Sequence, residues 1–234
     1  MKIKPVMLIS GTSRGIGKYL TEYYLKRGFV VIGCSRKPLD YKTGADYHHF
    51  CLDITDEVKV KEMFSFIRKK YGKLDVLLNN AGIASMNHSL LMPLETVRRI
   101  LDTNVVGTFL FSREAAKIMK KNNFGRIVNF ASIAVPLKLE GEAVYAASKA
   151  AVITLTEITS REYADYGILV NAIAPTPVYT DLVKGVPKEK LDKFLTRQAI
   201  HRFATPADIS GVIDFLIKKE NKMVTGQIIY LGGV

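Results

Sequence analysis

The sequence predicts an α/β fold, in which helices cover both faces of a doubly wound, seven-stranded parallel sheet. Short apolar runs typical of buried strands recur along the chain, and helical patterns separate most of them. The chain has 234 residues, 48% of them hydrophobic, which suits one domain with a large core. We therefore predict a single domain over residues 1–234, with strands at 6–10, 29–34, 47–51, 74–78, 126–131, 168–173 and 227–231.

The first predicted strand leads into a glycine turn and a helix. Gly11, Gly15 and Gly17 follow it in a G-x-x-x-G-x-G spacing, and Gly28 ends the helical pattern. Glycines at such a turn let the backbone approach a pyrophosphate, whose charge is favoured by the free N–H groups of a helix N-terminus. The segment predicts a dinucleotide site in a Rossmann-like sheet.

The connection between the second and third strands is short. Residues 37–46 include Pro38 and Gly44, and they leave little room for the helix that normally joins two parallel strands. We expect a loop or a single turn there, and hence an unusually open adenine end of the nucleotide site.

Tyr145 and Lys149 lie four residues apart in a helical pattern, and Ser132 lies thirteen residues before Tyr145. Residues four apart share one face of a helix, so the Lys149 ammonium can approach the Tyr145 phenol. A nearby cation lowers the pKa of a phenol towards the operating pH, which suits proton transfer to a carbonyl group. The alternative is a packed ring beside a solvated charge, which arises by chance in many helices.

Several motifs in the same order make the chain similar to the short-chain dehydrogenase/reductase family from residue 6 to about residue 233. Its closest resemblance is to the bacterial 3-oxoacyl-[acyl-carrier-protein] reductase type. The matching positions are the glycine turn from Gly11 to Gly17, Asp53, Asn79, Asn80, Ala81, Gly82, Asn104, Ser132, Tyr145, Lys149, Pro175 and Thr180.

The resemblance implies reduction of a ketone to a secondary alcohol by hydride transfer. In this interpretation Tyr145 donates the proton, Ser132 orients the carbonyl, and Lys149 lowers the tyrosine pKa and holds the nicotinamide ribose. Asn104 resembles the residue that supports a proton-relaying water. The structural alternatives are that Ser132 caps a loop and that Asn104 bonds neighbouring backbone.

The residues at the end of the second strand indicate the cofactor. An acidic residue there would bind the ribose hydroxyls of NAD, and a basic one would accept the 2′-phosphate of NADP. The sequence has no acid at this turn, and Arg36, helped by Arg14 and Ser35, is the predicted phosphate ligand. NADP(H) is therefore favoured over NAD(H). In the alternative, Arg36 and Lys37 are solvated surface charges and Asp40 reaches the ribose.

Asp53 resembles the family residue that meets the adenine amino group, and we interpret Asn79 as structural. Thr176 stands where the family usually has glycine after Pro175, which predicts a stiffer segment. The predicted cofactor-binding residues are Gly11, Ser13, Arg14, Gly15, Ile16, Gly17, Ser35, Arg36, Asp53, Ile54, Asn80, Ala81, Gly82, Tyr145, Lys149, Pro175, Val178 and Thr180.

The substrate is less defined than the cofactor. Residues 181–200 are a predicted lid, and the net charge of +12 favours acidic partners such as acyl carrier protein, a nucleotide sugar or a phosphate ester. Family members that act on acyl carrier protein usually place basic residues where this chain has Asn123, Phe124 and Tyr166. The alternatives are an enzyme for a sugar or another secondary alcohol and, less favoured by the intact predicted catalytic set, a non-catalytic NADP(H) sensor.

Other classes of protein are less consistent with the sequence. It has no run of eighteen apolar residues, no secretion signal and no nucleic-acid motif, so we expect a cytoplasmic protein that binds neither membrane nor nucleic acid. Cys34 and Cys51 are predicted to be buried rather than bridged. Adjacent His48 and His49 would point to opposite faces of a strand, so no metal site is predicted.

Assembly is a further expectation from the resemblance. Long helices predicted at 95–121 and 143–166 correspond to those through which family members pair. We therefore expect a homo-oligomer, either a dimer or a tetramer.

Overall fold

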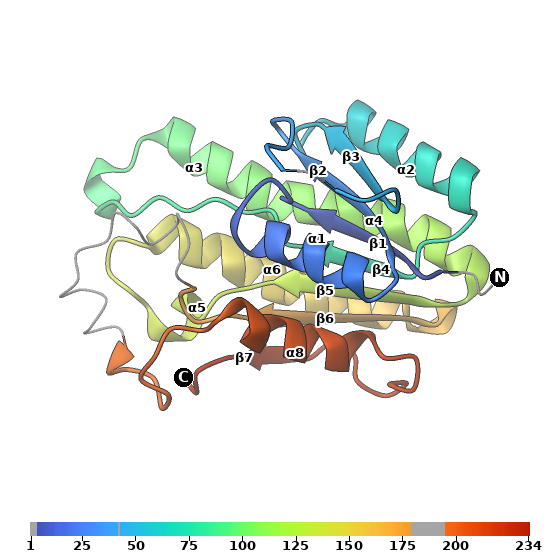
Figure 1. The fold of residues 1–234 in the computed structure, drawn as a ribbon. Helices are drawn as coiled ribbons and strands as arrows, with labels where there is room; N and C mark the ends of the chain where they lie inside the picture. The colour runs from blue at the N-terminus through green and yellow to red at the C-terminus, as the bar shows by residue number, and fades with distance from the viewer. Residues whose placement is uncertain (1–3, 42, 179–194) are drawn as a thin grey trace.

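A computed structural model describes residues 4–41, 43–178 and 195–234 of the protein. The described residues form a seven-stranded parallel sheet in the order β3-β2-β1-β4-β5-β6-β7, with helices on both faces (Figure 1). This confirms the predicted doubly wound, Rossmann-like fold, and each predicted strand end lies within two residues of the observed one. The strands are β1 (Val6–Ser10), β2 (Val30–Ser35), β3 (Tyr47–Cys51), β4 (Val76–Asn79), β5 (Gly125–Phe130), β6 (Ile168–Ala174) and β7 (Ile228–Tyr230).

Seven α-helices are described, together with shorter helical turns. The helices are α1 (Gly15–Lys26), α2 (Glu57–Tyr71), α3 (Leu94–Leu101), α4 (Gly107–Met119), α5 (Ala134–Leu137), α6 (Ala143–Glu162) and α8 (Pro206–Ile217). The short turns are η1 (Ser89–Leu91), η2 (Asp102–Val106), η3 (Lys120–Asn122) and η4 (Ala164–Tyr166).

Two apolar layers hold the helices to the sheet. Successive side chains of a strand point to opposite faces, so Leu8 of β1 packs in the layer formed with α2 and α4, whereas Met7 and Ile9 pack in the layer formed with α1 and α8. All five residues of β1 are buried, as expected for a central parallel strand covered on both faces. Because both faces of the sheet are packed against helices, the carboxyl ends of the strands have fixed positions, and residues that follow them can form a site.

The connection between β2 and β3 contains no helix among its described residues, which confirms the predicted loop. The two strands still pair in parallel, with Val31 opposite Tyr47 and Gly33 opposite His49. The edge strand β3 thus depends on the sheet and on side-chain contacts rather than on a crossover helix.

The predicted continuous helix over 95–121 is wrong in one respect. The π-helical turn η2 separates α3 from α4, and the Gly107 N–H donates to the Asp102 carbonyl five residues back. Ile54 packs where a side chain at Gly107 would lie, since a Cβ there would meet Ile54 Cδ1 at 2.5 Å. The contact between Ile54 and Gly107 therefore lies where the helix changes from α to π geometry. Asn104 lies within this π turn.

The two cysteines differ in burial. Cys34 on β2 is buried, but Cys51 at the end of the edge strand β3 is exposed, so its predicted burial is wrong. Both thiols are free.

Among the described residues, no cluster of three or more histidine, cysteine, aspartate or glutamate side chains is arranged to hold a metal ion. None of the described helices is both long and apolar enough to cross a membrane.

Candidate active site

The glycine turn between β1 and α1 is shaped by close backbone contacts. Gly11 has φ of +74°, a conformation that favours glycine, and its N–H donates to the Cys34 carbonyl at 2.9 Å. A Cβ at Gly17 would meet the Gly11 carbonyl oxygen at 2.1 Å. Asn80 Nδ2 donates to the Ser10 and Gly11 carbonyls at 2.9 and 3.2 Å. These contacts hold the turn beside the N-terminus of α1, where Ser13, Arg14, Gly15 and Ile16 lie.

The predicted adenosine end of the site lies at the carboxyl end of β2. Arg36 is exposed there, whereas Ser35 is buried and its hydroxyl donates to the Lys37 carbonyl at 2.7 Å. Ser35 therefore shapes the turn in this arrangement. The exposed Asp53 accepts hydrogen bonds from the Thr55 backbone and hydroxyl at 3.0 and 2.8 Å.

The predicted catalytic side chains come from the segment after β5, from α6 and from η2. Ser132 follows β5 and its Oγ accepts a hydrogen bond from the Ala134 N–H at 3.1 Å, so it also satisfies the first N–H group of α5. Tyr145 and Lys149 share one face of α6, with Lys149 Nζ 5.9 Å from the centre of the Tyr145 ring. The ammonium itself donates to the Phe130 carbonyl at 2.6 Å.

Burial dominates the protonation of this pair. It raises the pKa of Tyr145 to about 12, although the neighbouring Ser132 hydroxyl opposes the shift, and it lowers the pKa of Lys149 to about 8. The chain alone thus does not lower the tyrosine pKa as the helical spacing predicts, because the ammonium points to Phe130. Tyr145 is protonated at neutral pH, which is the state a proton donor requires.

Asn104 joins three segments of the site. Its Nδ2 donates to the Ile83 carbonyl and to Ser148 Oγ, both at 2.9 Å, and its Oδ1 accepts from the Ile83 N–H at 2.9 Å. A Cβ at Gly82 would lie 3.3 Å from Asn104 Oδ1 and 3.4 Å from Lys149 Nζ. The structure therefore brings the segment after β4, the π turn and the predicted catalytic lysine together.

The sequence analysis missed one polar residue behind the site and correctly assigned another. Buried Ser148 was not predicted; it accepts from Asn104 and donates to the Tyr145 carbonyl at 2.7 Å. Its position in the sequence between Tyr145 and Lys149 could have indicated it. The predicted structural role of Asn79 is confirmed, because its Nδ2 donates to Ser112 and Asn129 at 2.9 and 2.8 Å inside the core.

The segment after β6 is described only in part. The Pro175 carbonyl accepts from the Ile133 N–H at 3.5 Å, and buried Val178 forms a bridge with Ala204. Thr180 and residues 181–194 of the predicted lid lie outside the described residues.

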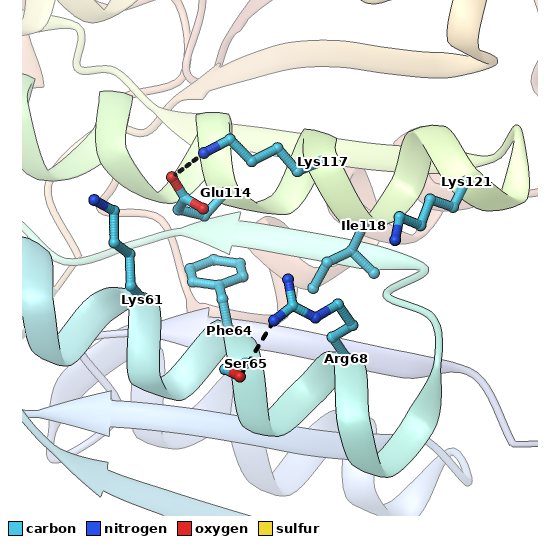
Figure 2. A pocket seen from close by; sticks show the side chains of 8 residues that line it. All are labelled: Lys61, Phe64, Ser65, Arg68, Glu114, Lys117, Ile118 and Lys121. Atoms are coloured by element: carbon cyan, nitrogen blue, oxygen red, sulfur yellow. Dashed lines mark hydrogen bonds and ion pairs between the residues drawn. The ribbon is translucent and has the colours of Figure 1, made fainter.

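Two grooves have linings that include none of these residues. One, of about 350 Å³, lies between α2 and α4 and is lined by four cationic side chains and by Glu114, which pairs with Lys117 at 2.7 Å (Figure 2). It contains none of the predicted site residues. The second, of about 340 Å³, lies along α5 and α6 and is lined partly by alanines.

Comparison with known proteins identifies the family. A sequence profile described as enoyl-(acyl carrier protein) reductase matches residues 11–233. A Vibrio cholerae protein named 3-oxoacyl-[acyl-carrier-protein] reductase FabG is 32% identical over 97% of this chain and 96% of its own length. The chain belongs to the short-chain dehydrogenase/reductase family. A Staphylococcus aureus relative with the same name is 33% identical over 100% of this chain and 98% of its own length.

Solved structures agree with this assignment. ElxO with NADP bound has a TM-score of 0.89 and 32% identity, covering 97% of each chain. A 4-hydroxyisoleucine dehydrogenase complexed with NADH has a TM-score of 0.88 and 27% identity, covering 98% of each chain. This short-chain family member is therefore an NAD(P)-dependent oxidoreductase that acts on alcohol and carbonyl groups. Both nucleotides occur among these relatives, so the preference depends on the residues of this chain.

Proposed function

We propose that this protein uses NADPH to reduce a ketone to a secondary alcohol, with a 3-oxoacyl thioester on acyl carrier protein as its substrate. The observation that carries the proposal is the convergence of Ser132, protonated Tyr145 and buried Lys149 at the carboxyl edge of the sheet. The names of the curated relatives support the choice of substrate.

The residues present fit a dinucleotide cofactor. Gly11 and Gly17 allow a compact turn, because a Cβ at Gly17 would meet the Gly11 carbonyl oxygen at 2.1 Å. The N–H groups at the N-terminus of α1, which this turn leads into, would bind the pyrophosphate. Arg36 supplies an exposed guanidinium for a 2′-phosphate. When bound, the cofactor supplies the hydride. Lys149 would hold its nicotinamide ribose, with Ala81 and Gly82 beside the adenosine ribose.

Proton delivery would come from the chain itself. Ser132 donates a hydrogen bond to the substrate carbonyl and orients it, and Tyr145 gives its phenolic proton to the developing alkoxide oxygen. The ammonium of Lys149 then stabilises the tyrosinate that forms. Because Lys149 already donates to the Phe130 carbonyl, a small movement of its long side chain would bring it to the ribose and to Tyr145.

Activity with matched substrates tests the proposal. We expect the protein to oxidise NADPH with an acetoacetyl thioester faster than with keto-sugars. Tyr145→Phe should lower turnover at least about 100-fold, because it removes the proton donor, while the Kd for NADPH stays within about twofold. Full turnover by this variant would overturn the catalytic assignment.

A sugar or another secondary alcohol is the second candidate substrate. A Thermoplasma acidophilum aldohexose dehydrogenase shares the fold, with a TM-score of 0.90 and 29% identity over 98% of this chain and 93% of its own. Phe124 and Tyr166 also replace family cations. However, Lys120 Nζ lies 3.9 Å from the centre of the Tyr166 ring and Lys219 Nζ 5.7 Å from that of Phe124, so positive charge remains at this surface. Faster turnover of a keto-sugar would favour this candidate.

We also propose a cytoplasmic homo-oligomer. Val106, Phe109 and Ile158 are exposed apolar side chains on the π turn, α4 and α6, where a second copy would cover them. Light scattering after size exclusion distinguishes dimer from tetramer, and a monomer at micromolar concentration would contradict this assembly.

A further inference from the structure

A chain of hydrogen bonds joins the glycine turn to the end of β2. Thr12 Oγ1 lies 3.0 Å from Tyr47 Oη, which lies 3.0 Å from His49 Nδ1. On its other side, His49 Nε2 lies 3.2 Å from Ser35 Oγ and 3.3 Å from the Lys37 carbonyl oxygen. Thr12, Tyr47 and Ser35 are buried. The chain therefore connects the predicted pyrophosphate segment with the predicted 2′-phosphate segment.

The contacts determine where the protons lie. The Ser35 hydroxyl donates its proton to the Lys37 carbonyl at 2.7 Å, so the Ser35–His49 contact requires a donor at Nε2. The Lys37 carbonyl can only accept, which places the imidazole proton at the same atom. His49 Nδ1 then accepts from the Tyr47 hydroxyl. Burial lowers the pKa of His49, which favours this neutral form.

Space for the chain comes from a glycine in β2. A Cβ at Gly33 would meet Tyr47 Oη at 2.0 Å and Thr12 Oγ1 at 2.7 Å, so only glycine lets these two side chains meet. The Tyr41 hydroxyl donates to the Thr12 carbonyl at 2.8 Å, with Lys18 Nζ 4.4 Å from the centre of its ring. The loop that replaces the crossover helix is thus fastened to the glycine turn.

We propose that His49 is a positioning residue for cofactor selection, which holds the turn from Ser35 to Lys37 in the shape that presents Arg36 to the 2′-phosphate of NADP(H). Within the described residues, exposed Arg36 makes no hydrogen bond or ion pair. A cation on a turn that is already fixed loses less freedom when it binds phosphate. The inference rests on the proposed preference for NADP(H).

The test compares three histidine variants. His49→Phe keeps a ring but removes both nitrogen contacts, whereas His49→Gln retains an N–H that can donate to the Lys37 carbonyl. His48→Phe is the matched control, since His48 is adjacent but bonds Tyr71 at 2.7 Å on the other face of β3. The Kd values for NADPH and NADH are measured by fluorescence titration, and Tm by thermal denaturation.

We expect His49→Phe to weaken NADPH binding about five- to tenfold, as the loss of one hydrogen bond would. The Kd for NADH should stay within about twofold of the wild-type value. His49→Gln should recover most of the NADPH affinity, and His48→Phe should change the Kd of neither nucleotide.

Tyr47→Phe removes the hydroxyl that donates to His49 Nδ1, and it should change the ratio of the NADPH and NADH Kd values less than His49→Phe does. An equal loss for both nucleotides, or an unchanged ratio in His49→Phe and Tyr47→Phe, would overturn the inference alone. A wild type that binds NADH as tightly as NADPH would overturn the cofactor proposal and this inference with it.

Discussion

Replacing Lys149 with methionine should stabilise the protein while it removes activity. Lys149 is buried, and burial lowers its pKa from 10.5 to about 8. Each tenfold change in proton affinity corresponds to about 1.36 kcal/mol, so keeping this group charged at pH 7 costs about 3 kcal/mol of folding free energy. Methionine has a similar length and no charge. It loses the hydrogen bond to the Phe130 carbonyl, worth about 1 kcal/mol, which leaves a net gain of about 2 kcal/mol.

The stability advantage of Lys149→Met over the wild type should fall as the pH rises. The folded-state pKa of Lys149 lies below its unfolded value, so folding favours the neutral amine and the penalty is complete below pH 8. It falls as the pH rises from about 8 to 10.5 and vanishes above that. The stability of the wild type should therefore reach that of Lys149→Met over this range and exceed it by about 1 kcal/mol at higher pH, where only the lost hydrogen bond distinguishes the two proteins.

Thermal and urea unfolding, followed by far-UV circular dichroism because the chain has no tryptophan, measure the difference. A gain of about 2 kcal/mol should raise Tm at pH 7 by roughly 4–8 °C. The exposed Lys69→Met on α2 is the control and should change stability by less than about 0.5 kcal/mol. A Lys149→Met variant less stable than wild type at pH 7, or a difference that does not narrow at high pH, would refute the reasoning.

Three further substitutions test the framework of the site by thermal denaturation and NADPH titration. Gly17→Ala places a Cβ 2.1 Å from the Gly11 carbonyl oxygen and should weaken NADPH binding at least about tenfold, with a loss of about 1–3 kcal/mol in stability. Asn129→Ala removes one of the two acceptors of Asn79 Nδ2 in the core, so one of its N–H groups is left unpaired, and should cost about 1–3 kcal/mol. Thr205→Ala removes the N-cap of α8 and should cost about 1 kcal/mol without changing NADPH affinity. Unchanged Tm values in any of these variants would contradict the corresponding contact.

Local sequence patterns were sufficient for the sheet because most strands are short, mainly apolar runs bounded by turn residues. The run over 168–173 appears as β6, and right-handed crossovers between parallel strands predict the doubly wound arrangement that the sheet shows. The missing helix between β2 and β3 was also predictable, since Pro38 and Gly44 interrupt a segment too short to hold one. Cys51 was not, because a strand pattern does not tell whether a residue lies at the exposed end of an edge strand.

Side-chain geometry in the candidate site depends on partners that are distant in sequence. The spacing of Tyr145 and Lys149 correctly predicts a shared helix face, but the ammonium has a stronger acceptor in the Phe130 carbonyl, nineteen residues away. Similarly, the residue types at the end of β2 indicate a phosphate site, whereas the hydrogen bonds that hold its turn come from His49 on the next strand. Sequence patterns indicate which chemical groups lie at the site, whereas contacts between distant segments determine the hydrogen-bond partner of each group.

Asn104 shows how a departure from regular structure serves this arrangement. The π turn shifts the register between α3 and α4, and within it the Asn104 amide bonds both polar backbone groups of Ile83 and the hydroxyl of Ser148. Ser148 in turn donates to the backbone of Tyr145, so a single buried amide connects the segment after β4 to the helix that carries the predicted proton donor. The Asn104 backbone carbonyl accepts from Thr108 Oγ1 at 2.7 Å and retains its second lone pair, so a role in holding Tyr145 in place is compatible with the proton-relaying water that the family resemblance implies.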